Sequence, residues 1–263
     1  MEMKEQLFDT SAKHYDDQFT NSLIGQRQRQ RVYAILREKG LLDGSRLIFE
    51  FNCGTGFDAD FFFKMGHSVT ATDASEKMIE QCKTARNSSI QFYPLRIQDA
   101  THDQALENAN FVFSNFGGLN CLNKDELKEF IELLSRKLKT DSQLAFVIMP
   151  KHCLWETVYF VVKGKWGEIG RRNKNLAQTV NVNGEEVPTF YHSPSELNRL
   201  LRQDFTLSAL RPIAFFLPPS YMEPFFSKHP WLLGILNKFE ILFSTWSKLA
   251  NWSDHYMLIA QRK

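Results

Sequence analysis

The chain alternates short apolar runs with amphipathic segments over its first 150 residues. Segments of the second kind repeat apolar residues every three or four positions, as helices do, and the clearest are residues 26–39 and 123–138. The apolar runs have the length of buried strands and lie at 46–51, 68–72, 90–93, 110–114 and 143–149. Strand and helix in alternation predict a parallel sheet with helices on both faces.

The pattern changes after Pro150. Two strand-like runs, 176–182 and 185–191, flank Asn183-Gly184, a pair typical of a type I′ hairpin turn. Ser193-Pro194-Ser195-Glu196 predicts a capped helix start. Strands are expected again at 207–216 and 255–261, and the residues between them, 217–252, form an insertion rich in aromatic side chains.

Two carboxylates end two of the predicted strands. Glu50 closes the first apolar run and is followed by Asn52-Cys53-Gly54-Thr55-Gly56, whereas Asp73 closes the second run, 23 residues later. A strand, a glycine-rich turn, a helix and a second strand with an acidic tip are typical of nucleotide-binding α/β proteins. A dinucleotide site is disfavoured because Asp58 would direct a negative charge at a pyrophosphate.

The spacing Glu50-x-Asn52-x-Gly54-x-Gly56 resembles motif I of class I S-adenosylmethionine (SAM)-dependent methyltransferases. Asn52 replaces the first glycine of that motif, and asparagine adopts left-handed backbone geometry more readily than most residues. The resemblance covers residues 5–150. It implies a doubly wound, mostly parallel seven-stranded α/β sheet with an antiparallel last strand at its edge, plus a cap built from insertions.

The same resemblance implies the cofactor contacts. Tyr15 would cover the SAM pocket, Asp73 would hold the ribose hydroxyls and Met78 would pack on the adenine, whose amino group Asp99 would reach. The full set of expected cofactor-binding residues is Tyr15, Glu50, Asn52, Gly54, Gly56, Asp73, Ala74, Met78, Gln98, Asp99, Ala100, Ser114 and Asn115.

Acceptor chemistry is expected beyond residue 150. His192 and the pair Asp254-His255 are candidate catalytic residues, because histidine titrates near neutral pH and a neighbouring carboxylate can tune it. A structural, hydrogen-bonded histidine is the alternative for each. The expected substrate-binding residues are Trp155, Tyr159, Arg171, Arg172 and Tyr191. The two arginines could instead form a solvated hairpin surface.

Composition narrows the class of protein. The 263 residues carry 32 basic and 30 acidic side chains, a net charge of +2. This charge does not predict the extended positive surface that binds nucleic acid. The four cysteines and seven histidines show no metal-ligand spacing, so no metal is expected.

Single cysteines and the lack of a signal-peptide pattern suggest a cytoplasmic protein. The apolar stretch 231–249 is interrupted by charges, so no stable membrane insertion is expected.

These observations predict an organisation and a function. Residues 1–150 would form the SAM-binding core with an N-terminal helical segment. Residues 151–263 would form the remaining strands of the sheet, together with two cap insertions at 151–192 and 217–252. The expected function is methyl transfer from SAM, giving S-adenosylhomocysteine (SAH), to a small, largely apolar, aromatic or lipid-like acceptor at oxygen. The alternatives are N- or C-methylation, or a non-catalytic SAM- or nucleotide-binding protein. An NAD-dependent dehydrogenase ranks last, and a homodimer is possible.

Overall fold

The computed structural model of the chain describes residues 21–174, 177–182 and 185–263. Its strands are β1 (Leu47–Phe51), β2 (Ser68–Asp73), β3 (Gln91–Pro94), β4 (Phe111–Ser114), β5 (Gln143–Ile148), β6 (Gln178–Val182), β7 (Glu185–Thr189), β8 (Phe205–Ile213) and β9 (His255–Arg262). Its α-helices are α2 (Leu23–Glu38), α3 (Phe57–Lys64), α4 (Glu76–Ala85), α5 (Gln104–Asn108), α6 (Lys124–Lys137), α7 (Leu154–Val162), α8 (Pro194–Leu201), α9 (Glu223–Phe226) and α10 (Pro230–Leu242). Short 3-10 turns are η3 (Ile97–His102), η4 (Gly118–Cys121), η5 (Trp166–Glu168), η6 (Arg171–Asn173), η7 (Ser220–Met222) and η8 (Ser247–Asn251).

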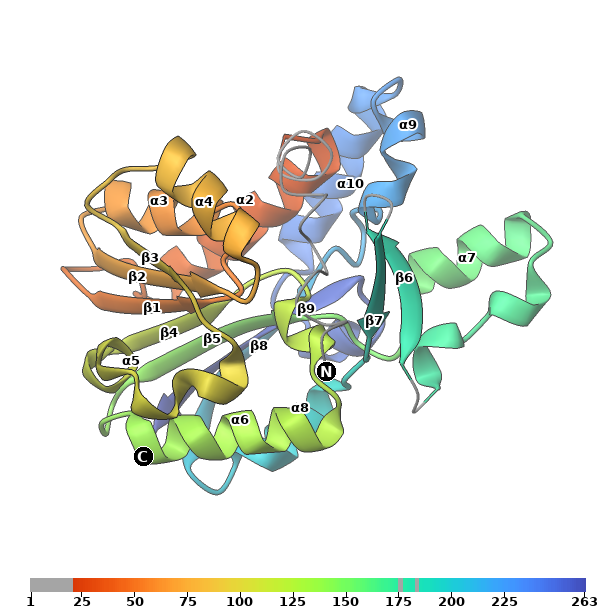
Figure 1. Ribbon diagram of the computed structural model, residues 1–263. Coiled ribbons are helices and arrows are strands. Elements are labelled where there is room, and N and C mark those ends of the chain that lie inside the picture. Colours follow the sequence, from red (N-terminus) through yellow and green to blue (C-terminus); the bar gives the residue numbers. More distant parts are fainter. Residues whose placement is uncertain (1–20, 175–176, 183–184) are drawn as a thin grey trace.

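Seven strands form the central sheet in the order β3-β2-β1-β4-β5-β9-β8. The first five are parallel, and β9 runs antiparallel to both β5 and β8 (Figure 1). The predicted doubly wound, mostly parallel sheet with an antiparallel last strand is therefore confirmed. The last strand lies inside the sheet rather than at its margin, because β8 occupies the outer position.

Alternating side chains of each strand enter two separate cores. Phe111 and Phe113 pack with α2, α3 and α4 on one face, whereas Val112 packs with α6 on the other. The predicted helix 26–39 corresponds to α2, which starts three residues earlier because Ser22 caps its N-terminus. The capping box predicted at Ser193 is present at the start of α8.

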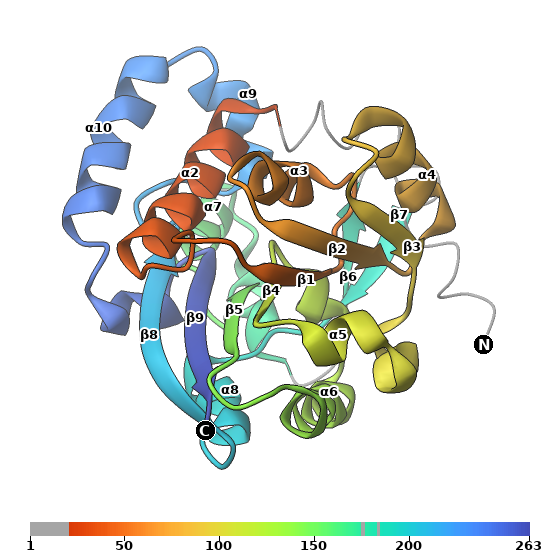
Figure 2. The ribbon, with the colours of Figure 1, turned by 90° about the vertical axis from the view of Figure 1, so that its left-hand side faces the viewer.

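Two groups of elements lie outside the sheet and its helices. The β6–β7 hairpin and α7 stand beyond the carboxyl end of β5, and α9 and α10 lie beside α2 (Figures 1 and 2). The predicted hairpin is present, although its turn residues Asn183 and Gly184 lie outside the described residues. Among the described residues, no helix combines the length and apolar character needed to cross a bilayer.

Two carboxylates connect α9 and α10 to the rest of the fold by hydrogen bonds. Glu240 of α10 is buried and accepts hydrogen bonds from the backbone N–H groups of Ala214, Phe216 and Leu217 at 2.8, 2.8 and 3.3 Å. Glu223 of α9 accepts from two N–H groups in the first turn of α2, each at 2.9 Å. These bonds supply acceptors that the loop and the helix terminus otherwise lack.

Candidate active site

The turn after β1 has three residues in left-handed backbone geometry. Asn52, Gly54 and Gly56 have φ of 54°, 53° and 72°. The expectation that Asn52 adopts this geometry is confirmed. A Cβ at Gly56 would lie 2.9 Å from the Phe92 ring and 3.0 Å from Sγ of Cys82, so only glycine fits between the turn and the neighbouring side chains. The loop after β4 packs closely against the same turn, because a Cβ at Gly118 would lie 2.4 Å from Cβ of Asn52.

Asp73 fixes the turn from the tip of β2. Its carboxylate accepts the Gly54 N–H at 2.9 Å and the Ser75 N–H at 3.0 Å. Burial raises the pKa of Asp73, although these backbone N–H groups oppose the shift. Each carboxylate oxygen can accept a further hydrogen bond, so the residue remains able to hold ribose hydroxyls.

Glu50 is a buried carboxylate with an unsatisfied oxygen. The residue is 1% exposed, and its Oε2 has no hydrogen-bond partner among the described residues. Burial, reinforced by the nearby charge of Asp58, holds the pKa of Glu50 well above its usual range. A buried acceptor of this kind fits a ligand that carries an ammonium group, as SAM does, because such a group would satisfy it.

Asp58, at the start of α3, is neutralised within the protein. Its carboxylate pairs with Arg29 of α2 at 2.5 Å and accepts hydrogen bonds from Tyr33 and, at 2.9 Å, from Asn115. The sequence suggested that the charge of Asp58 would face a bound pyrophosphate, whereas in the structure that charge has an internal counterion, Arg29. The cluster ties α2, α3 and the loop after β4 together at the turn.

Most of the residues expected to contact adenine lie on α4 and η3. Met78 is buried on α4 and Ala100 is buried on η3, whereas Ala74, Gln98 and Asp99 are exposed. Exposed side chains at the carboxyl ends of β2 and β3 are available to a ligand lying across that edge of the sheet. Tyr15 lies outside the described residues.

The tip of β4 carries Ser114, Asn115 and Phe116. Ser114 accepts a long, 3.5 Å hydrogen bond from the side chain of Asn52, and the Asn115 amide bonds Asp58. Phe116 has φ of 38°, an uncommon value for a bulky residue, and its ring meets the His255 ring edge-on at 5.4 Å. The last strand therefore contacts the loop that follows β4.

A buried ion network leads to His255. Arg172 donates to Glu156 at 3.0 Å, to the carboxylate of Asp254 at 2.8 Å and to the Asp254 carbonyl at 3.1 Å. Oδ2 of Asp254 lies 3.3 Å from Nδ1 of His255, a charge contact whose angle is poor for a hydrogen bond. Although burial opposes ionisation, His255 and Arg172 hold the pKa of Asp254 well below its usual range.

The burial of Arg172 contradicts the alternative of a solvated hairpin surface. Arg172 is 5% exposed, so it does not belong to a solvated hairpin surface. Arg171 is half-buried and makes a two-point contact with Glu156, at 2.9 and 3.1 Å. The N–H groups of both arginines are directed at Glu156 and Asp254, and carboxylate recognition by these side chains stays a prediction. Glu156, which joins them, gave no signal in the sequence.

His192 lies in a separate buried environment. Its Nε2 lies 2.9 Å from the carbonyl of Leu122, so this nitrogen carries the proton and Nδ1 is the basic atom. Burial lowers the pKa of His192, which favours the neutral ring. Its catalytic role stays a prediction.

Three aromatic residues expected to bind substrate lie near the ion network. The Tyr191 ring lies under the guanidinium of Arg172 at 5.1 Å, and Tyr159 meets Tyr221 at 5.2 Å. The Trp155 indole donates to the Phe216 carbonyl at 3.1 Å. The structure thus brings α7, η6, η7 and the start of β9 together, but it leaves the substrate roles untested.

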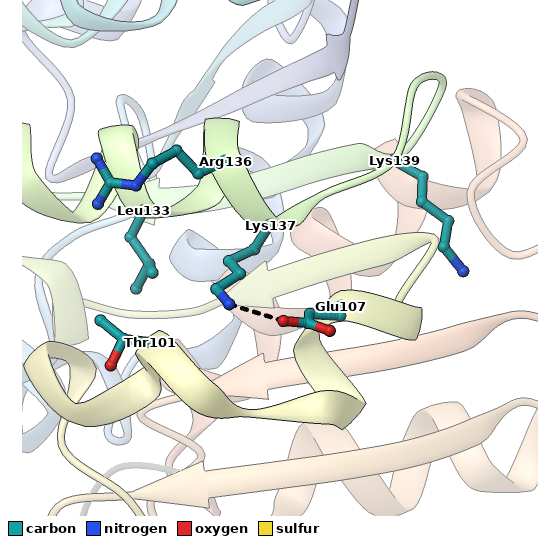
Figure 3. A pocket seen from close by; sticks show the side chains of 6 residues that line it. All are labelled: Thr101, Glu107, Leu133, Arg136, Lys137 and Lys139. Atoms are coloured by element: carbon teal, nitrogen blue, oxygen red, sulfur yellow. Dashed lines mark hydrogen bonds and ion pairs between the residues drawn. The ribbon is translucent and has the colours of Figure 1, made fainter.

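Other possible sites contain none of these residues. No group of three or more potential metal ligands occurs within the described part of the chain. A surface hollow of about 540 Å³ lies among η3, α5 and α6, and the Lys137–Glu107 ion pair (2.7 Å) spans it (Figure 3). It is lined by Thr101, Glu107, Leu133, Arg136, Lys137 and Lys139.

Comparisons of sequence and of fold point to the same kind of domain. Residues 48–141 match the family model described as a methyltransferase domain, and this range includes the turn, β2 and the tip of β4. Over these residues the chain is similar to a methyltransferase domain, and its fold is the one found in solved SAM-dependent methyltransferases. No curated protein matches the sequence significantly.

Solved structures with this fold are distant in sequence. The magnesium protoporphyrin IX methyltransferase of Synechocystis PCC 6803, solved with bound SAH, is 14% identical and has a TM-score of 0.60, covering 97% of this chain and 96% of that one. A SAM-dependent methyltransferase of Methanosarcina mazei is 16% identical, with a TM-score of 0.56 and coverage of 86% and 96%. One from Mesorhizobium loti is 12% identical, with a TM-score of 0.56 and coverage of 89% and 98%. These likenesses concern the fold.

Proposed function

We propose that the protein methylates a small, largely apolar or aromatic acceptor at oxygen. SAM supplies an already activated methyl group. Glu50 and the Gly54–Gly56 turn would hold its amino-acid portion, Asp73 its ribose, and Met78 with Asp99 its adenine. The observation that carries the proposal is the Arg172–Asp254–His255 chain, which ends against Phe116 at the tip of β4.

His255 is the proposed general base. Methylation at oxygen requires the acceptor hydroxyl to lose a proton, and a histidine is suited to accept it near neutral pH. Asp254 faces Nδ1, which leaves Nε2 for the acceptor, and an ionised Asp254 stabilises the protonated ring. Arg172 keeps Asp254 ionised despite burial, so it acts as a positioning residue.

The acceptor class is inferred from the surroundings of His255. The nearby side chains are aromatic, and the charged groups beneath them are paired with one another. Paired charges leave an apolar acceptor as the better match for this region. Residues 151–192 and 217–252 are proposed to cover the acceptor, and orientation and exclusion of water are their expected contributions.

The test measures SAH formation with three acceptor sets: phenols, apolar carboxylic acids and apolar amines. We expect phenols to be methylated, because a carboxylic acid is already ionised near neutral pH and needs no general base. His255→Gln and Asp254→Asn should lower kcat by about a hundredfold or more with little change in SAM affinity. His67→Gln is the matched control, because that histidine directly precedes β2, at the opposite end of the strand from Asp73. Preferential methylation of amines, or full activity of His255→Gln, would overturn the proposal.

A further inference from the structure

Exposed apolar side chains are concentrated in two segments of this protein. Of the 19 large apolar side chains that are exposed in the described part of the chain, 15 lie in residues 154–169 and 221–252. Single exposed apolar residues are ordinary on protein surfaces, whereas a contiguous group marks an interaction site. The two segments adjoin, because Tyr159 contacts Tyr221 and the Trp155 ring lies 6.0 Å from Phe226.

The helix α10 exposes large apolar side chains on its outer face, where Lys238 also lies. Leu233 and Glu240 are buried against the core. Trp231, Ile235, Phe239 and Leu242 recur at helical spacing on the opposite side, and they are exposed by 66%, 42%, 45% and 68%. A helix that only covered a core would carry mainly polar residues on that face.

The helix α7 repeats this arrangement. Glu156 and Phe160 are buried. Val158 and Val162 face outward, exposed by 47% and 77%, and Trp166 follows one turn later, exposed by 66%. Figure 1 shows α7 at the edge of the molecule, and Figure 2 shows α10 at an edge beside α2.

The exposed charges of the two segments are almost all positive. The exposed lysines are Lys163, Lys165, Lys228, Lys238 and Lys248, whereas the exposed acid is Glu168. The other acids are used internally: Glu156 pairs with arginines, Glu223 caps α2 and Glu240 binds backbone N–H groups. Tryptophan and lysine together are suited to a membrane interface, where the indole lies among headgroups and the ammonium reaches lipid phosphates.

We propose that this surface, residues 154–169 and 221–252, binds the face of an anionic phospholipid bilayer without crossing it. A second copy of the chain is a poorer occupant, because a two-fold interface would bring the lysines of one patch against those of the other. The bilayer offers both an apolar layer for the tryptophans and negative charge for the lysines.

The test measures sedimentation of the full chain with vesicles. We expect binding to vesicles of equal parts phosphatidylglycerol and phosphatidylcholine to be about tenfold tighter than to phosphatidylcholine alone, and to weaken with added salt. Leu242→Ala and the double variant Trp231→Ala/Trp246→Ala should weaken binding about tenfold or more. Leu47→Ala is the matched control, because Leu47 is exposed at the start of β1, away from the surface.

Lysine variants test the charge contribution separately. Lys238→Gln/Lys248→Gln should remove most of the preference for anionic vesicles, whereas Lys83→Gln on α4 should leave it unchanged. Far-ultraviolet circular dichroism on every variant verifies that the fold persists. Absence of vesicle binding, or equal binding by the tryptophan double variant and the wild type, would overturn the proposal. A dimer that Leu242→Ala dissociates, with no vesicle binding, would assign the surface to a second copy.

Discussion

Replacing Glu50 with glutamine separates the stability of the fold from the affinity for SAM. In the free protein the buried Oε2 of Glu50 has no hydrogen-bond partner within the described residues, and burial raises the pKa of its carboxyl group. The folded protein therefore binds this proton more tightly than the unfolded chain does. As a result, the free energy of unfolding falls as the pH rises from the ordinary carboxyl pKa toward the raised value of the folded state.

Glutamine has nearly the same shape and no charge to desolvate. Above the raised pKa, Glu50→Gln should increase the free energy of unfolding by about 1–3 kcal/mol, the cost of a buried unsatisfied polar group. At low pH, where the carboxyl group is protonated in both states, the variant and the wild type should be equally stable. Urea unfolding followed by circular dichroism at several pH values measures both quantities.

The affinity for SAM should change in the opposite direction. Loss of a charge-assisted contact to the ammonium costs about 1.5–3 kcal/mol, which weakens binding about tenfold to a hundredfold in a calorimetric titration. Glu129→Gln, on the exposed side of α6, is the control and should alter neither measurement. Reduced stability of Glu50→Gln near neutral pH, or unchanged SAM affinity, would refute the assignment of Glu50.

Three further substitutions test the turn and the insertion. Asp73→Ala should weaken SAM binding about tenfold or more in calorimetry, because ribose hydrogen bonds are lost together with the support of Gly54; unchanged affinity would remove Asp73 from the site. Gly118→Ala should cost about 1–3 kcal/mol in urea unfolding, since its Cβ would meet Asn52, and Asn52→Gly in the same chain should restore most of it. A purely additive pair would contradict that contact. Glu240→Ala should destabilise the protein by about 3 kcal/mol, because three backbone N–H groups lose their acceptor; a smaller loss than for the exposed Glu129→Ala would contradict this role.

The sheet was predictable because the sequence pattern of each strand lies within a few consecutive residues. Each apolar run of the first 150 residues corresponds to one strand, and Ser193-Pro194-Ser195-Glu196 starts a helix as its capping chemistry requires. The turn was also predictable, because Asn52 and the two glycines supply the left-handed geometry it needs.

The supporting network was not predictable, because its partners are remote in sequence. Arg29 and Asp58 are 29 residues apart, and Arg172 and Asp254 are 82 apart, so no pattern along the chain connects them. The place of β9 inside the sheet depends on hydrogen bonding with two strands at once, which hydrophobic pattern alone does not determine. Burial of Arg172 likewise follows from tertiary packing, since basic runs usually face solvent.

A crystal structure of the protein with bound SAH tests the central claim most directly. The account predicts the ribose on Asp73, the amino group beside Glu50 and the Gly54–Gly56 turn, and the sulfur on the side of Phe116 that faces His255. SAH bound away from the carboxyl edge of β1 and β2, or with its sulfur remote from His255, would contradict it.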